Sequence, residues 1–171
     1  MSQHLKWGQR TFDFNFPVEV FPEMIERIRG TPARLEDRIA ELSTETLTRR
    51  HADRWSIQEN AGHLLDIEEL FSRRLDEYLS GAPTLHAADM SNKKTFAADH
   101  NSKPVQTILS AFRSQRGRLV HRFEDLPPAA FGNVSHHPRL DKPMRLVDML
   151  FFQAEHDDYH LARISELIRE S

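Results

Sequence analysis

The sequence predicts an all-α fold, a four-helix bundle with one long crossover. Four long segments carry apolar residues at helical spacing, and no strand-rich region competes with them. The connection between the second and third segments is long enough to cross the end of a bundle, so these two helices need not be antiparallel neighbours.

Composition narrows the class of protein. At 171 residues, with 39% hydrophobic and 29% charged residues, we expect a single soluble domain over residues 1–171. A net charge of -3 argues against nucleic acid as a partner. The absence of cysteine excludes disulfides, thiolate ligands and a cysteine nucleophile, which leaves imidazoles and carboxylates for chemistry. Without a membrane-length apolar run or a signal peptide, we expect a cytoplasmic protein with no membrane partner.

The first limb of the bundle follows an extended arm. In residues 1–17, Phe12, Phe14 and Phe16 alternate with polar residues, which predicts an extended arm laid against the body without a regular sheet. Residues 22–29 have helical spacing, and Gly30-Thr31-Pro32 either kinks this helix or caps a new one that runs to Leu42.

The second helix has the clearest start signal. Ser56 with Glu59 three residues later forms a capping box, and an apolar stripe follows as far as Leu79. The runs Glu68-Glu69 and Arg73-Arg74 are interpreted as a solvated face. Residues 81–103 form the crossover, with a short helix expected at about 88–99.

The remaining helices are expected at 104–124 and at about 145–169, separated by an irregular stretch at 129–143. His136 and His137 lie in this stretch, where surface exposure is favoured over a place on a pocket rim. Five other histidines are interpreted as ordinary surface or loop residues: His4, His51, His86, His100 and His121.

The last helix places polar residues on its core face. Gln153, His156, Asp157 and His160 fall within the arc of its leucines and isoleucines, and buried polar groups are costly unless something satisfies them. His156 and His160 lie one turn apart, as in helical metal sites. The alternative is a pair of surface or hydrogen-bonded core histidines.

His63, on the second helix, is a candidate third ligand. If the second and fourth helices face each other, three imidazoles surround one point and leave an open position, as in catalytic metal sites. Four carboxylates are expected to accept hydrogen bonds from the outer ring nitrogens: Glu59, Asp66, Glu155 and Asp157. Trp55, just before the capping box, is expected to act as a hydrophobic staple or to cover the bundle end.

Two motifs together resemble a known family. The segments W-S-I-Q-E at 55–59 through G-H-L at 62–64, and A-E-H-D-D-Y-H at 154–160, are similar to those of the DinB/YfiT-like superfamily of metal-dependent enzymes. The resemblance covers nearly the whole chain. It implies an up-down-down-up four-helix bundle, frequent homodimerisation, and nickel or zinc bound by His63, His156 and His160.

The resemblance also implies an activity. Some members are transferases or isomerases that use a low-molecular-weight thiol, whose pKa the metal lowers. We therefore expect a thiol-dependent transferase that acts on a small-molecule substrate. Two alternatives remain at this point: a metal-dependent hydrolase, and a non-enzymatic small-molecule-binding or stress-response bundle.

Overall fold

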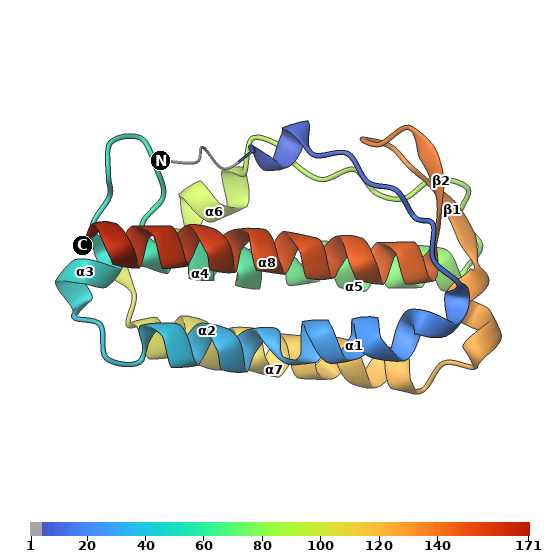
Figure 1. Ribbon diagram of the computed structural model, residues 1–171, viewed down its shortest axis with the longest axis horizontal. Coiled ribbons are helices and arrows are strands. Elements are labelled where there is room, and N and C mark those ends of the chain that lie inside the picture. Colours follow the sequence, from blue (N-terminus) through green and yellow to red (C-terminus); the bar gives the residue numbers. More distant parts are fainter. Residues whose placement is uncertain (1–4) are drawn as a thin grey trace.

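The structure, a computed structural model that describes residues 5–171, contains four long helical limbs, as the sequence predicts (Figure 1). The first four residues of the expected arm, including His4, lie outside the described residues. The limbs are α1 (Phe21–Arg29) with α2 (Thr31–Ile39), α4 (Ile57–Asp66) with α5 (Glu68–Leu79), α7 (Val105–Glu124), and α8 (Leu146–Glu170). Two short helices, α3 (Thr44–Thr48) and α6 (Lys93–Ala98), lie in the connections. None of the described helices is long and apolar enough to cross a lipid bilayer.

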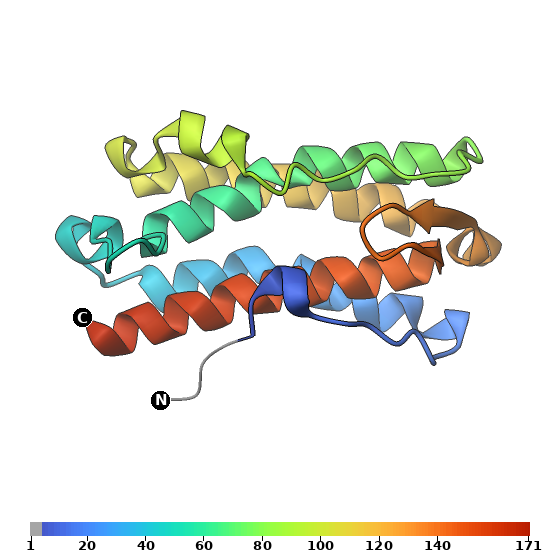
Figure 2. The ribbon, with the colours of Figure 1, turned by 90° about the horizontal axis from the view of Figure 1, so that it is seen from above.

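The limbs run up, down, down and up. α5 ends at the same end of the bundle as β1 and β2, and the crossover returns along the whole bundle so that α7 runs parallel to α4 and α5 (Figures 1 and 2). α8 packs between the first and second limbs, and α7 also contacts both. The second and fourth limbs therefore face each other, which is the condition for a shared histidine site.

The described part of the N-terminal arm lies along α8 (Figure 2). It contains a 3-10 turn, Trp7–Gln9, and no strand in its described part, and a second 3-10 turn, Val18–Val20, follows it. Phe12 is buried, and the Phe16 ring centroid lies 5.3 Å from that of Phe151 on α8. The alternating phenylalanines therefore attach the arm to the last helix.

The second limb bends at Ile67 instead of forming one regular helix. The backbone N–H of Ile67 still donates to the His63 carbonyl, and Ile67 accepts from Phe71, so the limb continues through the bend. The capping box at its start is confirmed, because Ser56 Oγ accepts from the Glu59 N–H at 3.0 Å and the Glu59 side chain accepts from Ser56 N–H.

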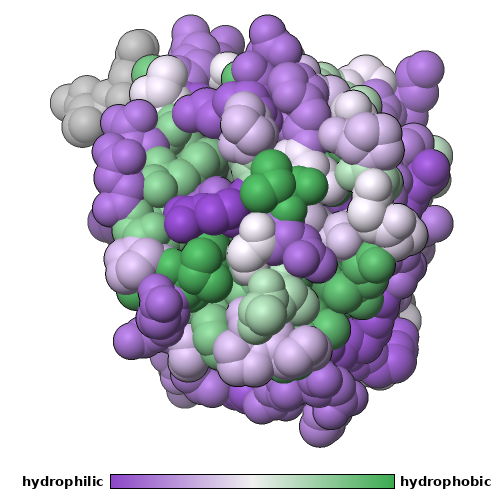
Figure 3. Space-filling model, turned by 90° about the vertical axis from the view of Figure 1, so that its right-hand side faces the viewer, coloured by the Kyte–Doolittle hydropathy of each residue, from purple (hydrophilic) through white to green (hydrophobic). Residues whose placement is uncertain are grey.

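The stretch at 129–143 is not irregular, contrary to expectation. A 3-10 turn, Pro128–Gly132, leads into a β-hairpin of β1 (Val134–His137) and β2 (Lys142–Arg145). Its edge pairs with the crossover, since His136 N–H donates to Pro83 and its carbonyl accepts from Leu85. Seen from this end, the molecule shows apolar patches among polar side chains (Figure 3). The segment that pairs with His136 lies more than 50 residues earlier in the sequence. A pairing over such a distance leaves no local pattern from which it could be predicted.

Two apolar clusters fill the bundle, and a buried charged layer separates them. One cluster includes Ile28 and Phe71, and the other includes Leu35 and Leu64. Between them each limb contributes one polar residue, and these are Thr31, Glu68, Arg116 and Asp157, all buried. Arg116 donates to Glu68 at 2.6 Å and to Asp157 at 2.5 Å.

A solvated face was expected at Glu68-Glu69 and Arg73-Arg74, and this expectation is wrong for one residue of each pair. Glu68 and Arg74 are buried, whereas Glu69 and Arg73 are exposed, because successive helical positions point about 100° apart. Buried charges of this kind need specific partners, and Glu68 has one in Arg116.

Candidate metal centre

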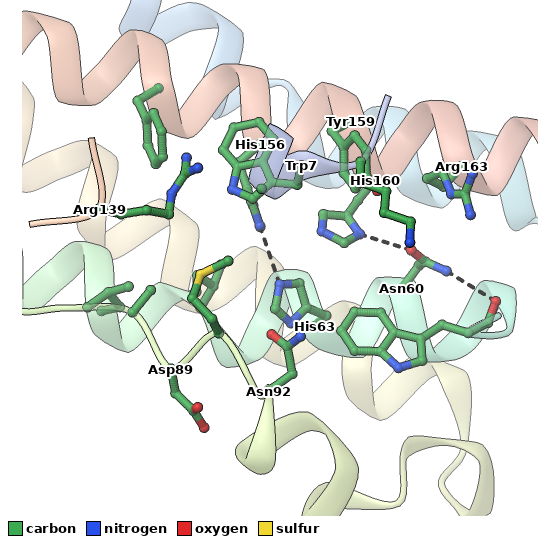
Figure 4. Close-up of a pocket in the computed structure, with 18 of the residues that line it drawn as sticks. Trp7, Asn60, His63, Asp89, Asn92, Arg139, His156, Tyr159, His160 and Arg163 are labelled. Carbon is green, nitrogen blue, oxygen red and sulfur yellow. Dashed lines mark hydrogen bonds between the residues drawn. The ribbon is translucent and has the colours of Figure 1, made fainter. Parts of the chain in front are cut away.

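The structure brings the three predicted histidines together inside the bundle. His63 projects from α4, and His156 and His160 project from successive turns of α8 (Figure 4). One ring nitrogen of each lies within 4.8 Å of the other two, and His63 Nε2 is 3.4 Å from His156 Nε2. All three side chains are buried. The three imidazoles form a group that could bind one metal ion.

Asn60 orients His160. The Asn60 amide nitrogen donates to the Ser56 carbonyl at 2.8 Å, so its oxygen is the acceptor for His160 Nδ1 at 2.9 Å (Figure 4). His160 must then carry its proton on Nδ1, which leaves Nε2 as a lone-pair donor. Asn60 lies on the core-facing side of α4, one turn before Leu64, and its polarity on that face is a signal that the sequence interpretation missed.

Thr95 plays the same part for His63. Its hydroxyl lies 3.0 Å from His63 Nδ1. A hydroxyl can accept the Nδ1–H of a neutral imidazole, and in that tautomer His63 presents Nε2 as a lone pair. Thr95 belongs to α6 in the crossover, and no sequence signal marks it.

The four carboxylates expected to hold the outer ring nitrogens bond elsewhere. They are Glu59, Asp66, Glu155 and Asp157, and they accept from Arg50, His100, Arg27 and Arg116 respectively. A carboxylate gains more from a cationic guanidinium than from a neutral imidazole, which explains most of these pairings.

His100 is not the surface residue that was expected. It is buried, and its Nε2 lies 2.8 Å from Asp66 Oδ2. Burial raises the pKa of Asp66, but hydrogen bonds from His100 and Thr95 outweigh this effect and hold that pKa below its usual value. The His100 ring packs directly on Gly62, where a Cβ would lie 2.2 Å from the imidazole Cγ.

Burial keeps the three histidines neutral. It lowers the pKa of His63 to about 4, and it lowers the pKa values of His156 and His160 well below 6.5. Neutral imidazoles are the form that binds metals. His156 Nδ1 has no hydrogen-bond partner among the described residues.

The histidine group lies on the wall of a cavity of about 670 Å³. Trp7 and Trp55 flank it: the ring centroid of Trp7 is 5.0 Å from that of His156, and the centroid of Trp55 is 4.9 Å from that of His63. Trp55 thus forms part of the cavity wall. His137, expected at the surface, is also buried and lines the cavity, whereas His136 is only partly buried.

The fold and this group define a class of protein: a helical bundle in which three buried histidines, which could hold a metal ion, line a cavity. The chain belongs to the DinB superfamily, whose family model matches residues 27–164. Comparison with curated proteins finds no match.

Solved structures support the fold. The chain is similar to YfiT from Bacillus subtilis, described as a probable metal-dependent hydrolase with an unusual four-helix bundle topology, with TM-score 0.80 and 19% identity over 94% of this chain and 93% of that one. It is also similar to a mycothiol-dependent maleylpyruvate isomerase, with TM-score 0.68 and 10% identity. The latter match covers 90% of this chain but only 62% of the isomerase.

Proposed function

We propose that this protein is a metal-dependent transferase, in which His63, His156 and His160 bind nickel or zinc and a low-molecular-weight thiol is the co-substrate. One observation carries the proposal: three buried imidazoles on a cavity wall each have a ring nitrogen within 4.8 Å of the other two. The alternative of two unrelated core histidines does not explain why a third imidazole from another helix joins them.

The residues fit such an ion. Imidazole suits nickel and zinc, and three protein ligands leave a further position for a substrate. Asn60 and Thr95 hold the outer nitrogens of His160 and His63, which is how ligand histidines are commonly oriented. The cavity next to the group has room for a small molecule.

The arrangement of carboxylates favours a thiol over water as the nucleophile. When bound, the metal would lower the pKa of a thiol or of water. Hydrolysis commonly also uses a general base within hydrogen-bond reach. The carboxylates among the described cavity residues are Asp53 and Asp89, both exposed, and Asp89 is already bonded to Ser91 and Lys93.

The proposed reaction is a substitution at an electrophilic carbon. The thiol sulfur forms a bond to carbon, the leaving group departs with its electron pair, and the thiol proton passes to solvent. Trp7 and Trp55 pack against His156 and His63 and give this part of the cavity an aromatic wall.

The first test is metal content, measured on untagged full-length protein. We expect about one nickel or zinc ion per chain, lost in a His63→Ala, His156→Ala double variant and retained in His121→Ala, which changes an exposed histidine. Wild-type protein that binds neither ion after incubation would overturn the proposal.

The second test separates the activities. We expect a thiol-dependent absorption change in the nickel-loaded protein and turnover of a haloaromatic electrophile only with thiol present. Ester hydrolysis that needs metal but no thiol would favour the hydrolase instead. Metal binding with neither activity would favour a non-enzymatic bundle.

A further inference from the structure

Among residues 5–171, two arginines are fully buried, and their surroundings are opposite. Arg116 bonds to two carboxylates, those of Glu68 and Asp157. Arg74, on α5, is 1% exposed, yet its guanidinium donates only to the His86 carbonyl and, at 3.9 Å, to the Met149 sulfur. No carboxylate forms an ion pair with it among the described residues, and residues 1–4 contain no acidic side chain. A buried cation without a counter-ion is costly.

A second arginine and a histidine extend this cationic region. Arg139, in the turn of the β-hairpin, has a buried Nη2 with no hydrogen-bond partner in the described part of the chain. His137 is 1% exposed, and its Nδ1 accepts from the Leu140 N–H at 3.2 Å. The neutral ring must then carry its proton on Nε2, and this N–H is also buried and unpartnered. Two buried donors are therefore left without acceptors.

These groups line the same cavity as the three histidines. Arg139 Cζ lies 5.5 Å from the Phe152 ring centroid and 5.7 Å from that of Trp7, whose ring also contacts His156. Figure 4 shows Arg139 on the His156 side of the cavity, away from Arg163. One small molecule can therefore reach both the arginine region and the histidine group.

We propose that Arg74, His137 and Arg139 form a carboxylate-binding subsite, which takes the acid group of a small organic substrate. The two unpartnered donors, Arg139 Nη2–H and His137 Nε2–H, match the two oxygens of a carboxylate. The positive charge of Arg74, which lines the same cavity, compensates the negative charge of the carboxylate. A phosphate, with more oxygens and charge, would leave acceptors unsatisfied here, while Trp7 and Phe152 favour an organic body next to the acid.

The role of this subsite in catalysis rests on the proposed function, because it would place a substrate's reactive carbon relative to the three histidines. Its existence does not depend on the metal. Binding of a carboxylate can therefore be tested separately from metal content.

The experiment compares benzoate with benzamide, which has the same shape but no charge. Titrations use full-length protein, as purified and after metal removal, with tryptophan fluorescence or calorimetry as the readout. We expect benzoate to bind at least ten-fold more tightly than benzamide in both states. Arg139→Gln should weaken benzoate binding at least ten-fold and leave benzamide binding unchanged.

The matched control is Arg163→Gln, which removes the same charge from another part of the cavity, where Arg163 pairs with Glu166. It should change benzoate binding less than two-fold. Equal binding of benzoate and benzamide, equal effects of the two arginine variants, or tighter binding of inorganic phosphate than of benzoate would each overturn the proposal. Because Arg139 lies in a surface turn, its variant should fold, and an unchanged urea midpoint verifies this.

Discussion

His63 Nε2 lies 3.4 Å from His156 Nε2, although the two residues are 93 positions apart in sequence. A hydrogen bond between these nitrogens requires a proton on one of them. A metal ion bound by both would instead require a lone pair on each. When Thr95 accepts from His63 Nδ1, the lone pair of His63 is on Nε2, and His156 is then the residue that must change tautomer. Its Nδ1 has no partner among the described residues, which leaves it free to accept that proton.

Removing the partner of an outer ring nitrogen should weaken metal binding. Thr95→Val keeps the shape of the side chain but removes the hydroxyl that orients His63. We expect a 10- to 100-fold lower metal affinity by chelator competition. Thr107→Val, at an exposed position on α7, is the control and should have no effect. Equal affinities in the two variants would show that Thr95 does not orient the ligand.

Gly62 should not tolerate a side chain. A Cβ there would lie 2.2 Å from the His100 ring, so Gly62→Ala must displace His100 from its bond with Asp66. We expect a loss of about 2 kcal/mol or more in the free energy of unfolding. Gly117→Ala, in the open on α7, should instead stabilise by about 0.5–1 kcal/mol through helix propensity. Urea denaturation of both variants tests the contrast.

Asp157 belongs to the buried charged layer, whereas its neighbour Asp158 is partly exposed, so the two should differ in their contribution to stability. Asp157→Asn leaves the buried Arg116 with one carboxylate instead of two and should cost about 3 kcal/mol of stability. Asp158→Asn affects partly exposed pairs with Arg27 and Arg34, and should cost less than about 1 kcal/mol. Thermal or urea unfolding distinguishes the two, and equal losses would contradict the assigned roles.

His137 should make stability depend on pH. Burial, reinforced by Arg74 and Arg139, lowers its pKa to about 3, against 6.5 for an ordinary histidine. Between these values the unfolded chain binds a proton that the folded protein does not, so stability falls as pH decreases from 6.5 toward 3. His137→Leu should remove about 2–4 kcal/mol of this dependence.

The measurement is the urea midpoint at several pH values between 7.5 and 4, in a buffer without carboxylates. His121→Gln, at an exposed position, should keep the wild-type pH profile. A His137→Leu profile identical to wild type would show that His137 is protonated normally in the folded protein.

The local signals in the sequence were sufficient for the four long helical limbs and for the pair of histidines on the last helix. The capping box at Ser56, the apolar stripes and the polar residues on the core face of the last helix all depend on neighbours within one or two turns. The same periodicity placed His156 and His160 side by side. Periodicity alone could not decide whether His63 joins this pair, because that requires the second and fourth limbs to face each other. The packing of α4 against α8 confirms that they do.

Only the tertiary structure decided which partners these side chains have. Thr95, His100 and the β-hairpin reach their positions through pairings between distant segments, and local patterns carry no information about such pairings. The same holds for burial at single positions, where Glu68 and Arg74 turn inward while their neighbours Glu69 and Arg73 face solvent. Periodicity therefore determined the helices and the histidine pair, whereas long-range packing determined the hydrogen bonds and charges around them.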